Sequence, residues 1–235
     1  LENRLLLEHE STQKTSTKNA TFITDVSHQL KTPLAALKLY CELDHEHNSG
    51  TYIEKQLVLI ERMEHLIYSL MRLEKLRADA YEMQFAKHDF SQLATLVWEE
   101  LQPLYPQKTV HVSGRVTMRY DAYWMSEALM NILKNSCEHT AVNGNILVSL
   151  ETADASVTVT VEDNGGGIAD EELPQLFQRF YRSSRALPNG GAGIGLAITK
   201  TIVEKHHGTI YAENTAQGLK IILCFPRLDG VTAMG

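Results

Sequence analysis

The sequence predicts an α+β protein in which a helical hairpin precedes an α/β sandwich, a mixed sheet with helices on one face. Residues 1–80 contain one proline, Pro33, and one glycine, Gly50, and their apolar residues recur at three- and four-residue steps. After about residue 83 the pattern changes to short alternating segments separated by helical ones. We therefore expect a helical domain over residues 1–80 and a sheet-containing domain over residues 87–228.

Bulk composition narrows the class of protein. The 235 residues carry 22 Lys and Arg against 29 Asp and Glu, a net charge of −7, which argues against a nucleic-acid-binding surface. The longest apolar runs fall short of the ~20 residues that a membrane span needs. The 3 cysteines show no CxxC or metal-ligand spacing, as is usual in a reducing compartment. Because the chain opens on Leu1 inside a helical pattern, we expect a piece of a longer protein.

A histidine stands off the apolar stripe of the first predicted helix. The stripe comprises Ile23, Val26, Leu30, Leu34, Leu37 and Cys41. His28 lies outside it and is expected to face solvent or a partner. Pro33 removes a backbone donor and crowds the preceding turn, so we expect the helix to bend just past His28. An exposed imidazole beside a bend would be accessible to a second domain, as a phosphate acceptor must be.

The second predicted helix, residues 51–79, carries more apolar surface than a hairpin can cover. Its apolar residues form two adjacent rows: Leu59, Met63, Leu66, Leu70 and Leu73, and beside them Ile53, Leu57, Ile60 and Ile67. Two hairpins closing into a four-helix bundle would cover both rows, so we expect a homodimer through residues 1–80. The alternative is that the hairpin packs on its own C-terminal domain.

The remaining elements alternate between strand and helix patterns after a linker at residues 80–86. Strands are predicted at 82–90, 109–112, 116–119, 146–150, 157–162, 209–213 and 219–225. Strands 109–112 and 116–119 are predicted to pair across a turn at Ser113 and Gly114. Helices are predicted at 91–101, 122–139 and 194–206, with Ser91 and Asp121 as caps of the first two.

Two glycine-rich segments predict a phosphate-binding pocket. Residues 163–168, Asp-Asn-Gly-Gly-Gly-Ile, follow a predicted strand, and Asp163 can accept a hydrogen bond from an exocyclic amine such as that of adenine. Residues 190–196, Gly-Gly-Ala-Gly-Ile-Gly-Leu, open directly into a helix, where glycine amides suit an anion. The second segment is not a Walker A loop, because no Gly-Lys-Ser/Thr follows. The first segment alone also fits an ordinary turn at the end of a strand.

Two asparagines share one face of the predicted helix 122–139. Asn131 and Asn135 are four residues apart, and Glu127 lies one turn earlier on the same face. Their oxygens could hold a hydrated Mg²⁺ that bridges phosphates, although asparagines with this spacing also occur on ordinary helix surfaces.

A predicted lid separates the two glycine segments. The aromatic segment 176–182 leads into a polar stretch, 183–189, rich in helix breakers. Arg182 and Arg185 are candidate phosphate clamps there. The other histidines show no ligand spacing, and five of them are expected to be solvated: His45, His47, His65, His206 and His207.

Together these segments resemble the catalytic core of histidine kinases. SHQLKTPL, NILKNSCEHT, DNGGGI, LFQRFYR and GGAGIGLAI are similar to the family's H-box, N-box, first glycine box, F-box and second glycine box, in the family's order and spacing. The resemblance implies a dimerisation and phosphotransfer hairpin followed by a Bergerat-type ATP-binding domain. It also implies that the γ-phosphoryl of ATP passes to His28 and then to an aspartate in the receiver domain of a response regulator. The full-length protein is expected to be a membrane-anchored sensor with this part in the cytoplasm.

The resemblance implies roles at the matching positions. His28 would be the phosphoacceptor, Asn135 an Mg²⁺ ligand supported by Asn131 and Glu127, and Asp163 the adenine contact. The residues expected to shape or line the ATP pocket are Gly165, Gly167, Ile168, Arg182, Gly191, Gly193, Gly195 and Leu196.

Two positions depart from the family pattern. Glu or Asp usually follows the phosphoacceptor, but here it is Gln29, which cannot act as a general base near neutral pH. Either Gln29 orients the ring while another group or water takes the proton, or autophosphorylation is slow. Gln29 and Thr32 could also position a water that hydrolyses an aspartyl phosphate, so our hypothesis is a bifunctional kinase and phosphatase. Glu138 stands where Lys is more usual, so phosphate binding is expected to depend more on the lid arginines.

Two other functional classes fit parts of the sequence. A conformational ATPase of the gyrase, chaperone or mismatch-repair type would use the same nucleotide site, but the H-box and the short lid argue against it. A scaffold that has lost ATP binding is opposed by the intact glycine segments and by Asn135.

Overall fold

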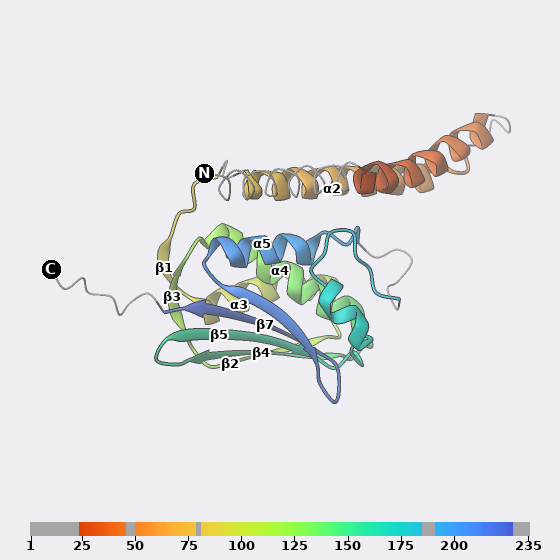
Figure 1. Cartoon of the computed structure of the whole chain (residues 1–235). Helices are drawn as coiled ribbons and strands as arrows, with labels where there is room; N and C mark the ends of the chain where they lie inside the picture. The colour runs from red at the N-terminus through yellow and green to blue at the C-terminus, as the bar shows by residue number, and fades with distance from the viewer. Residues whose placement is uncertain (1–23, 46–49, 79–80, 185–190, 228–235) are drawn as a thin grey trace, which may run out of the picture. The chain divides into compact units, whose positions relative to one another are not determined.

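The computed structural model describes residues 24–45, 50–78, 81–184 and 191–227. The chain divides into two compact units, Leu1–Tyr68 and Ser69–Gly235 (Figure 1). In the described part of the chain, no helix is long and apolar enough to cross a membrane.

The first unit contains a helix over residues 24–45 and most of α2 (Ile53–Arg77). The first helix continues through Pro33, and His28 is exposed on it, as predicted. The bend past His28 stays a prediction. Ile23, the first residue of the predicted stripe, lies outside the described residues.

Polar and aromatic contacts join the start of α2 to the end of the first helix. The Asp44 carboxylate accepts hydrogen bonds from the Tyr52 amide at 3.1 Å and from Gln56 Nε2 at 2.7 Å. The Tyr40 and Tyr52 rings stack with their centroids 5.2 Å apart, and Lys55 Nζ lies 5.5 Å from the Tyr40 centroid. These contacts fix the two helices as the predicted hairpin, since they link residues eight to fifteen positions apart across the turn.

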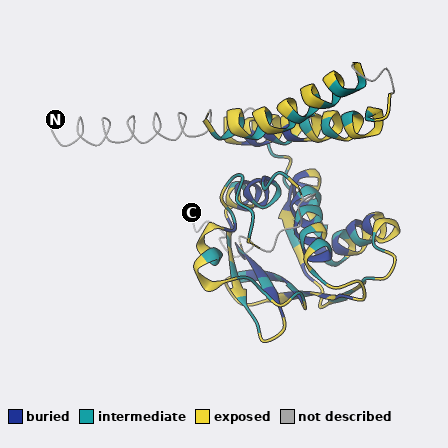
Figure 2. Cartoon of the chain, turned by 90° about the vertical axis from the view of Figure 1, so that its right-hand side faces the viewer, coloured by how far each residue is buried: buried dark blue, intermediate teal, exposed yellow. Residues whose placement is uncertain are grey.

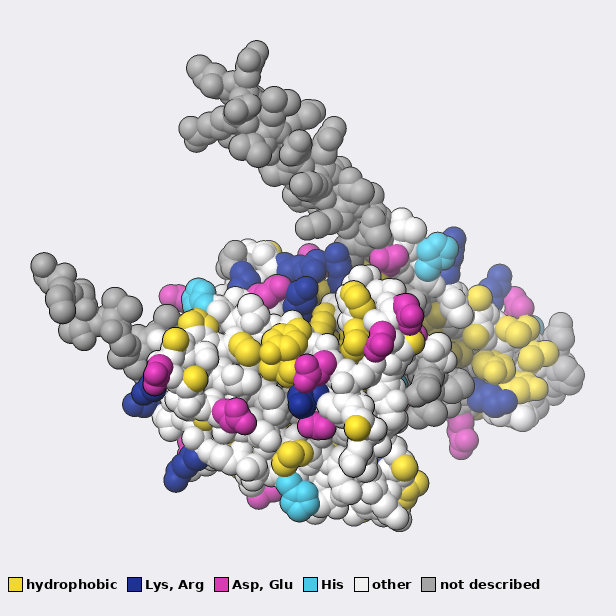
Figure 3. Space-filling model, turned by 60° about the horizontal axis from the view of Figure 1, so that its bottom comes forward, with side chains coloured by type: hydrophobic (Ala, Val, Ile, Leu, Met, Phe, Trp, Pro, Cys, Tyr) yellow, Lys and Arg dark blue, Asp and Glu magenta, His cyan; other side chains and the backbone are white. Residues whose placement is uncertain are grey.

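The hairpin leaves much of its apolar surface uncovered (Figure 2). The exposed large apolar residues of the first unit are Leu34, Leu39, Ile53, Leu57, Val58, Ile60, Ile67 and Tyr68. Apolar side chains gather at the hairpin end on the right of Figure 3. One hairpin therefore does not bury these side chains by itself, as the width of the apolar arc predicts.

The second unit is built on a five-stranded mixed sheet of order β2-β4-β5-β7-β6. Its strands are β2 (Thr109–Ser113), β4 (Asn145–Thr152), β5 (Ser156–Asp163), β6 (Thr209–Asn214) and β7 (Leu219–Pro226). β2 runs parallel to β4, and the other neighbours are antiparallel. Alternate residues of β5 are buried, as expected of a strand covered on one face.

Three helices cover one face of this sheet: α3 (Phe90–Leu101), α4 (Ala122–His139) and α5 (Gly195–Lys205) (Figure 1). Two short 3₁₀ turns, Gln102–Leu104 and Asp170–Gln175, and the end of α2 complete the helical elements of this unit among the described residues. The other face carries side chains of both charges among apolar ones (Figure 3). The α+β class, with helices on one face of a mixed sheet, agrees with the prediction.

One predicted strand pair is wrong. Segments 109–112 and 116–119 do form β2 and β3 (Thr117–Tyr120), but these strands do not pair with each other. β2 joins the main sheet, whereas β3 pairs with β1 (Ala86–Asp89) in a separate two-stranded ribbon. Gly114 (φ 85°) turns the chain where any Cβ would strike the Leu150 carbonyl, and the Val116 carbonyl accepts the Phe90 amide at 2.8 Å.

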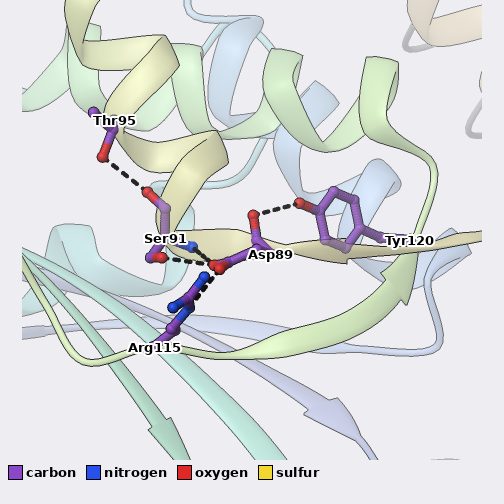
Figure 4. Close-up of polar contacts among 5 residues, drawn as sticks. All are labelled: Asp89, Ser91, Thr95, Arg115 and Tyr120. Carbon is purple, nitrogen blue, oxygen red and sulfur yellow. Dashed lines mark hydrogen bonds and ion pairs between the residues drawn. The ribbon is translucent and has the colours of Figure 1, made fainter.

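The cap of α3 is Asp89 rather than Ser91. Asp89 Oδ1 accepts hydrogen bonds from the Ser91 amide at 2.9 Å and from its hydroxyl at 2.6 Å (Figure 4). Asp121 caps α4 as predicted, accepting the Trp124 amide at 3.1 Å. The core between helices and sheet includes Phe90 and Ile132, both 0% exposed.

Candidate active site

The predicted nucleotide residues come from three elements of the second unit: the end of β5, one face of α4 and the start of α5. Asp163 is the last residue of β5, Asn131 and Asn135 lie in α4, and Gly195 begins α5. Because α4 and α5 pack against each other, the asparagine face and the second glycine segment are brought together.

Asp163 is a buried carboxylate held by two backbone amides. Its side chain is in a residue only 5% exposed, and Oδ1 accepts the Gly165 amide at 2.9 Å and the Leu219 amide at 3.2 Å. Within the described chain, Oδ2 accepts no hydrogen bond, so one carboxylate oxygen is left as an acceptor for a ligand. An exocyclic amine such as that of adenine would satisfy it.

The loop after Asp163 is fixed by a residue that sequence analysis missed, Asn214 at the end of β6. Asn214 Oδ1 accepts the Ile168 amide at 3.0 Å, and Nδ2 donates to the Ile168 carbonyl at 2.8 Å. Gly167 (φ 68°) lies so near that a Cβ there would be 2.5 Å from Asn214 Oδ1. Only glycine therefore fits this conformation and contact, which is the reason for the third glycine of the segment.

Asn131 presents an unsatisfied buried amide to the second glycine segment. Among the described residues its Nδ2 has no hydrogen-bond partner, and a Cβ added at Gly195 would lie 3.1 Å from its Oδ1. Ile194 offers no side-chain cap to the 11-residue helix α5. Its first amides can therefore bind an anion such as a phosphate. Asn131 Nδ2, which lacks a described partner, and the uncapped start of α5 are both suited to bind a nucleoside triphosphate.

The other two predicted site residues of α4, Asn135 and Glu127, differ in their contacts. Asn135 is half-buried one turn beyond Asn131, where its amide oxygen can serve as an Mg²⁺ ligand. Glu127 is already paired: Arg72 Nη1 lies 2.8 Å from its Oε1, both within the second unit. A role for Glu127 at a metal would require that ion pair to open. Among the described residues, no three His, Cys, Asp or Glu side chains cluster as metal ligands.

The lid segment is anchored at its described ends. Glu172 accepts the Ser184 amide at 2.9 Å, and this hydrogen bond is the main cause of the lowered pKa of its carboxyl. Phe180 (φ 62°) donates its amide to the Gly193 carbonyl at 2.8 Å. Gly193 (φ 72°) has no room for a Cβ, which would strike the Tyr181 carbonyl. The aromatic segment and the second glycine segment are thus locked together on either side of residues 185–190.

Other predicted pocket residues are placed less tightly. A Cβ added at Gly191 would meet no atom of the described residues within 4 Å. Leu196 is half-buried in the first turn of α5, and Arg182 is half-buried beside the lid. Arg185 lies outside the described residues.

The Glu138 carboxylate, at the end of α4, contacts one cationic and one hydroxyl side chain. Lys134 Nζ lies 3.9 Å from its Oε1, and the Tyr105 hydroxyl is 3.4 Å away. Burial and the nearby Glu138 raise the pKa of Tyr105 to about 12. Sequence analysis missed Lys108, whose Nζ donates to the Thr140 carbonyl at 2.8 Å and so satisfies the end of α4. No local pattern marks Lys108 or Asn214, because each contacts a segment distant in sequence.

His28 belongs to the first unit. Its side chain is exposed, Gln29 is half-buried, and the Thr32 hydroxyl donates to the His28 carbonyl at 3.4 Å. The imidazole is therefore accessible, while Thr32 is engaged with the helix backbone.

Comparisons with known proteins match both units. Residues 18–79 match the family described as His Kinase A (phospho-acceptor) domain. Residues 120–229 match the family described as histidine kinase-, DNA gyrase B-, and HSP90-like ATPase. Sensor histidine kinase CusS of Escherichia coli K12 is 31% identical over 227 residues, covering 89% of this chain and 46% of that protein. Sensor protein kinase PmrB of Pseudomonas aeruginosa is 30% identical, covering 89% and 45%.

Solved structures agree on the fold. Mycobacterial sensor histidine kinase MprB is 26% identical with a TM-score of 0.57, covering 60% of this chain and 97% of that one. Histidine kinase AdeS of Acinetobacter baumannii has a TM-score of 0.71 over 86% of this chain and 98% of that one, at 20% identity, which shows the fold alone. The chain spans about half the length of the curated relatives it matches.

The second unit is therefore an ATP-binding domain of the class shared by histidine kinases, gyrase and Hsp90. Because a phospho-acceptor domain precedes it, the chain belongs to the sensor histidine kinases of two-component systems. The match to the phospho-acceptor family also argues against the conformational-ATPase alternative.

Proposed function

We propose that this chain transfers the γ-phosphoryl group of ATP to Nε2 of His28, and from there to an aspartate of a response-regulator receiver domain. The observation that carries the proposal is the combination of an exposed His28 with an ATP site that holds a buried unsatisfied amide, Asn131 Nδ2. ATP binding and phosphate acceptance are thus both supplied by one chain.

Positioning and charge neutralisation would provide the catalysis. Asp163 would orient adenine, and the amides at the start of α5 would hold phosphate oxygens. Mg²⁺, held by the Asn135 amide oxygen with Asn131 in support, would neutralise charge on the phosphates. Arg182 would reach the same phosphates from the lid. Neutral His28 would attack in line, so its Nε2 must be unprotonated.

Gln29 limits how the proton leaves His28. An amide orients a ring nitrogen by hydrogen bonding but cannot accept its proton near neutral pH. Water or a group of another unit would therefore take the proton. With Thr32, the same amide would position a water for hydrolysis of the partner's aspartyl phosphate. In support, one relative is named histidine-protein kinase/phosphatase MprB, 31% identical to this chain over 216 residues.

The decisive experiment is incubation with γ-labelled ATP and Mg²⁺, comparing wild type with His28→Ala. The expected result is acid-labile label on wild type and none on the variant, because phosphohistidine hydrolyses in acid. His45→Ala, a substitution at another exposed histidine of the same helix, is the matched control and should keep the label. Acid-stable label, or label retained by His28→Ala, would contradict the proposal.

The role of Gln29 is tested by Gln29→Glu. A carboxylate there can take the imidazole proton, so autophosphorylation should accelerate by about 10-fold or more. Hydrolysis of phosphorylated regulator should fall, since the amide that orients water is lost. No gain in autophosphorylation would show that proton acceptance is not limiting.

Three further assignments belong to the same proposal. The uncovered apolar face of the hairpin supports a homodimer. A solved structure of histidine kinase ThkA in complex with response regulator TrrA has a TM-score of 0.70 to this chain, and by analogy the hairpin would dock the receiver domain. The full-length protein would be a membrane-anchored sensor, with this part in the cytoplasm.

A further inference from the structure

A cavity of about 490 Å³ lies at the end of the second unit away from the candidate ATP site. Val157 at the start of β5 lines the cavity, whereas Asp163 at the end of β5 belongs to the ATP site. Six residues of strand separate them, or roughly 20 Å. Likewise α5 begins at Gly195 in the ATP site and ends next to His206, which lines the cavity. The two sites are therefore distinct.

The lining of this cavity is strongly basic. Its cationic residues are Lys87, Arg115, Arg119 and Arg227, and the described lining contains no Asp or Glu. The whole chain carries a net charge of −7, so this concentration of cations runs against the composition. The potential inside the cavity therefore favours an anion.

Two of these cations face each other directly. Lys87 in β1 and Arg119 in β3 are cross-strand partners in the antiparallel ribbon. Like charges directly opposite each other destabilise a strand pair. Within the described chain, no carboxylate lies within ion-pair distance of either one; Arg119 Nη2 donates instead to the Phe85 carbonyl at 3.1 Å. An anion bound between them would remove the repulsion.

A third cation is held in place at the same rim. Arg115 Nε donates to Asp89 Oδ2 at 2.6 Å, and Oδ1 of the same carboxylate caps α3 (Figure 4). Hydrogen bonds from Ser91 and then Arg115 lower the pKa of Asp89 to about 2, so the carboxylate stays charged and keeps Arg115 oriented. The guanidinium has five N–H donors, and the Nε contact uses one of them.

The inner wall is apolar. Val157 and Phe225 are buried at 3% and 2% exposure, and Phe85 packs edge-on to His206 with centroids 5.1 Å apart. His206 Nε2 accepts the Asp121 amide at 3.0 Å, and Nδ1 lies 2.7 Å from the Ile202 carbonyl. The ring is therefore neutral, with the proton on Nδ1, and both of its nitrogens are already engaged within the fold.

From this geometry we infer a second ligand site on the catalytic unit, which binds a small organic anion: an apolar or aromatic body that bears a carboxylate, sulfonate or phosphate. The apolar body would lie against Val157 and Phe225, and the anionic group between Lys87 and Arg119. The volume agrees with small-molecule sites, which span roughly 300–1,000 Å³. A small molecule fits better than a peptide segment, because the exposed cations and the apolar wall line one compact cavity that is open to solvent on one side.

The test uses 8-anilinonaphthalene-1-sulfonate, an aromatic sulfonate whose fluorescence rises in apolar sites. It is titrated into the whole chain in excess ADP and Mg²⁺, so that the ATP site is occupied. The pocket variant is Lys87→Gln with Arg119→Gln. The matched control, Lys38→Gln with Lys200→Gln, removes the same two charges from exposed i,i+4 ion pairs elsewhere. A third variant, Thr117→Trp, fills the cavity from an exposed lining position and keeps every charge.

We expect saturable binding of one probe per chain that persists with ADP and Mg²⁺. The pocket variant and Thr117→Trp should each weaken it at least 10-fold, and the control variant by less than 2-fold. Displacement by ADP would place the probe in the ATP site and overturn the inference. Equal weakening in the control, or unchanged binding in both pocket variants, would assign the probe to general surface charge or to the hairpin and would also overturn it.

Thermal unfolding gives an independent readout. Without ligand, the pocket variant should melt no lower than wild type, because the Lys87–Arg119 repulsion is gone. Added probe should raise the midpoint of wild type and not that of the pocket variant. A pocket variant that melts clearly lower than wild type without ligand would show that the two cations stabilise the empty fold, and would contradict the inference.

Discussion

The two units of this chain bury their apolar residues to different extents. In the second unit, Ile132, Leu129 and Met125 of α4 are 0% exposed between the helices and the sheet. In the first unit, Leu34 is 56% exposed, Leu57 53% and Val58 62%. Apolar residues of similar size are thus fully buried in the second unit and about half exposed to solvent in the first.

This difference shows which unit is complete in a single chain. The sheet and three helices of the second unit enclose a core without help from another molecule. The described part of the first unit is two helices, so one side of each helix packs against nothing among these residues. A second copy would supply the missing layers. The following predictions test this contrast, from the largest effect to the smallest.

The largest effect is expected from charges in the uncovered hairpin face. Leu34→Glu with Leu57→Glu removes four leucines from a dimer interface, each worth ~1.5–3 kcal/mol on burial. The dimer dissociation constant should rise by at least about 10⁴-fold, measured by sedimentation equilibrium. Leu104→Glu, at a side chain 71% exposed in the second unit, is the control and should leave the dimer intact. Dimers that survive in the double variant would mean that another surface associates.

A cavity in the second core should be the next largest effect. Ile132→Ala removes a 0% exposed side chain and should lower the free energy of unfolding of the second unit by ~2–5 kcal/mol. Denaturant titration followed by tryptophan fluorescence reports this unit, because Trp98 and Trp124 both lie in it. Leu96→Ala, at a side chain 62% exposed, should change it by less than about 0.5 kcal/mol. Equal losses would mean that burial does not govern stability here.

Nucleotide affinity tests the site within the second unit. Asp163→Asn keeps an acceptor for the Gly165 and Leu219 amides but can turn the free acceptor into a donor. ADP affinity should fall by about 2–3 kcal/mol, or roughly 30- to 150-fold, with little change in folding midpoint. Calorimetric titration measures it, with Asp154→Asn, an exposed carboxylate between β4 and β5, as the control. Undiminished affinity would remove Asp163 from the adenine contact.

The smallest effect is a pH dependence from His206. Burial lowers the pKa of this imidazole, against the opposing hydrogen bond to Ile202 and the charge of Asp121, while His207 adds to the lowering. Below a pH of about 6.5, the usual pKa of an unfolded histidine, this imidazole binds a proton more readily in the unfolded chain than in the folded one. The His206 contribution is therefore complete above pH 6.5 and declines as pH falls through the lower folded pKa.

Urea titrations between pH 8 and 5.5 measure this slope. His206→Gln should flatten it, and His111→Gln, at an exposed ring in β2, should keep it. An unchanged slope in His206→Gln would assign the dependence to another group.

Much of the fold was predictable because the signals are local. Helical periodicity, the change of period near residue 83 and the Asp121 cap of α4 depend on neighbours in sequence, whereas the phosphate-binding role of the glycine segments stays a prediction. The cap of α3 was wrong by two residues, since Asp89 and Ser91 both have capping side chains and the end of β1 decides between them. His206 was expected to be solvated but is buried, and its Nε2 accepts the amide of Asp121. These two residues are 85 positions apart, so no local pattern could connect them.

The sequence by itself determined the two-part organisation, the helix and strand inventory, and the residue types at the ATP site, since each follows from spacing along the chain. Tertiary structure alone decided that β2 pairs with β4 rather than β3, that Asn214 fixes the loop after Asp163, and that Lys87 and Arg119 oppose each other in one cavity. These features join residues from different elements, and their energies depend on distances that exist only after the chain has folded.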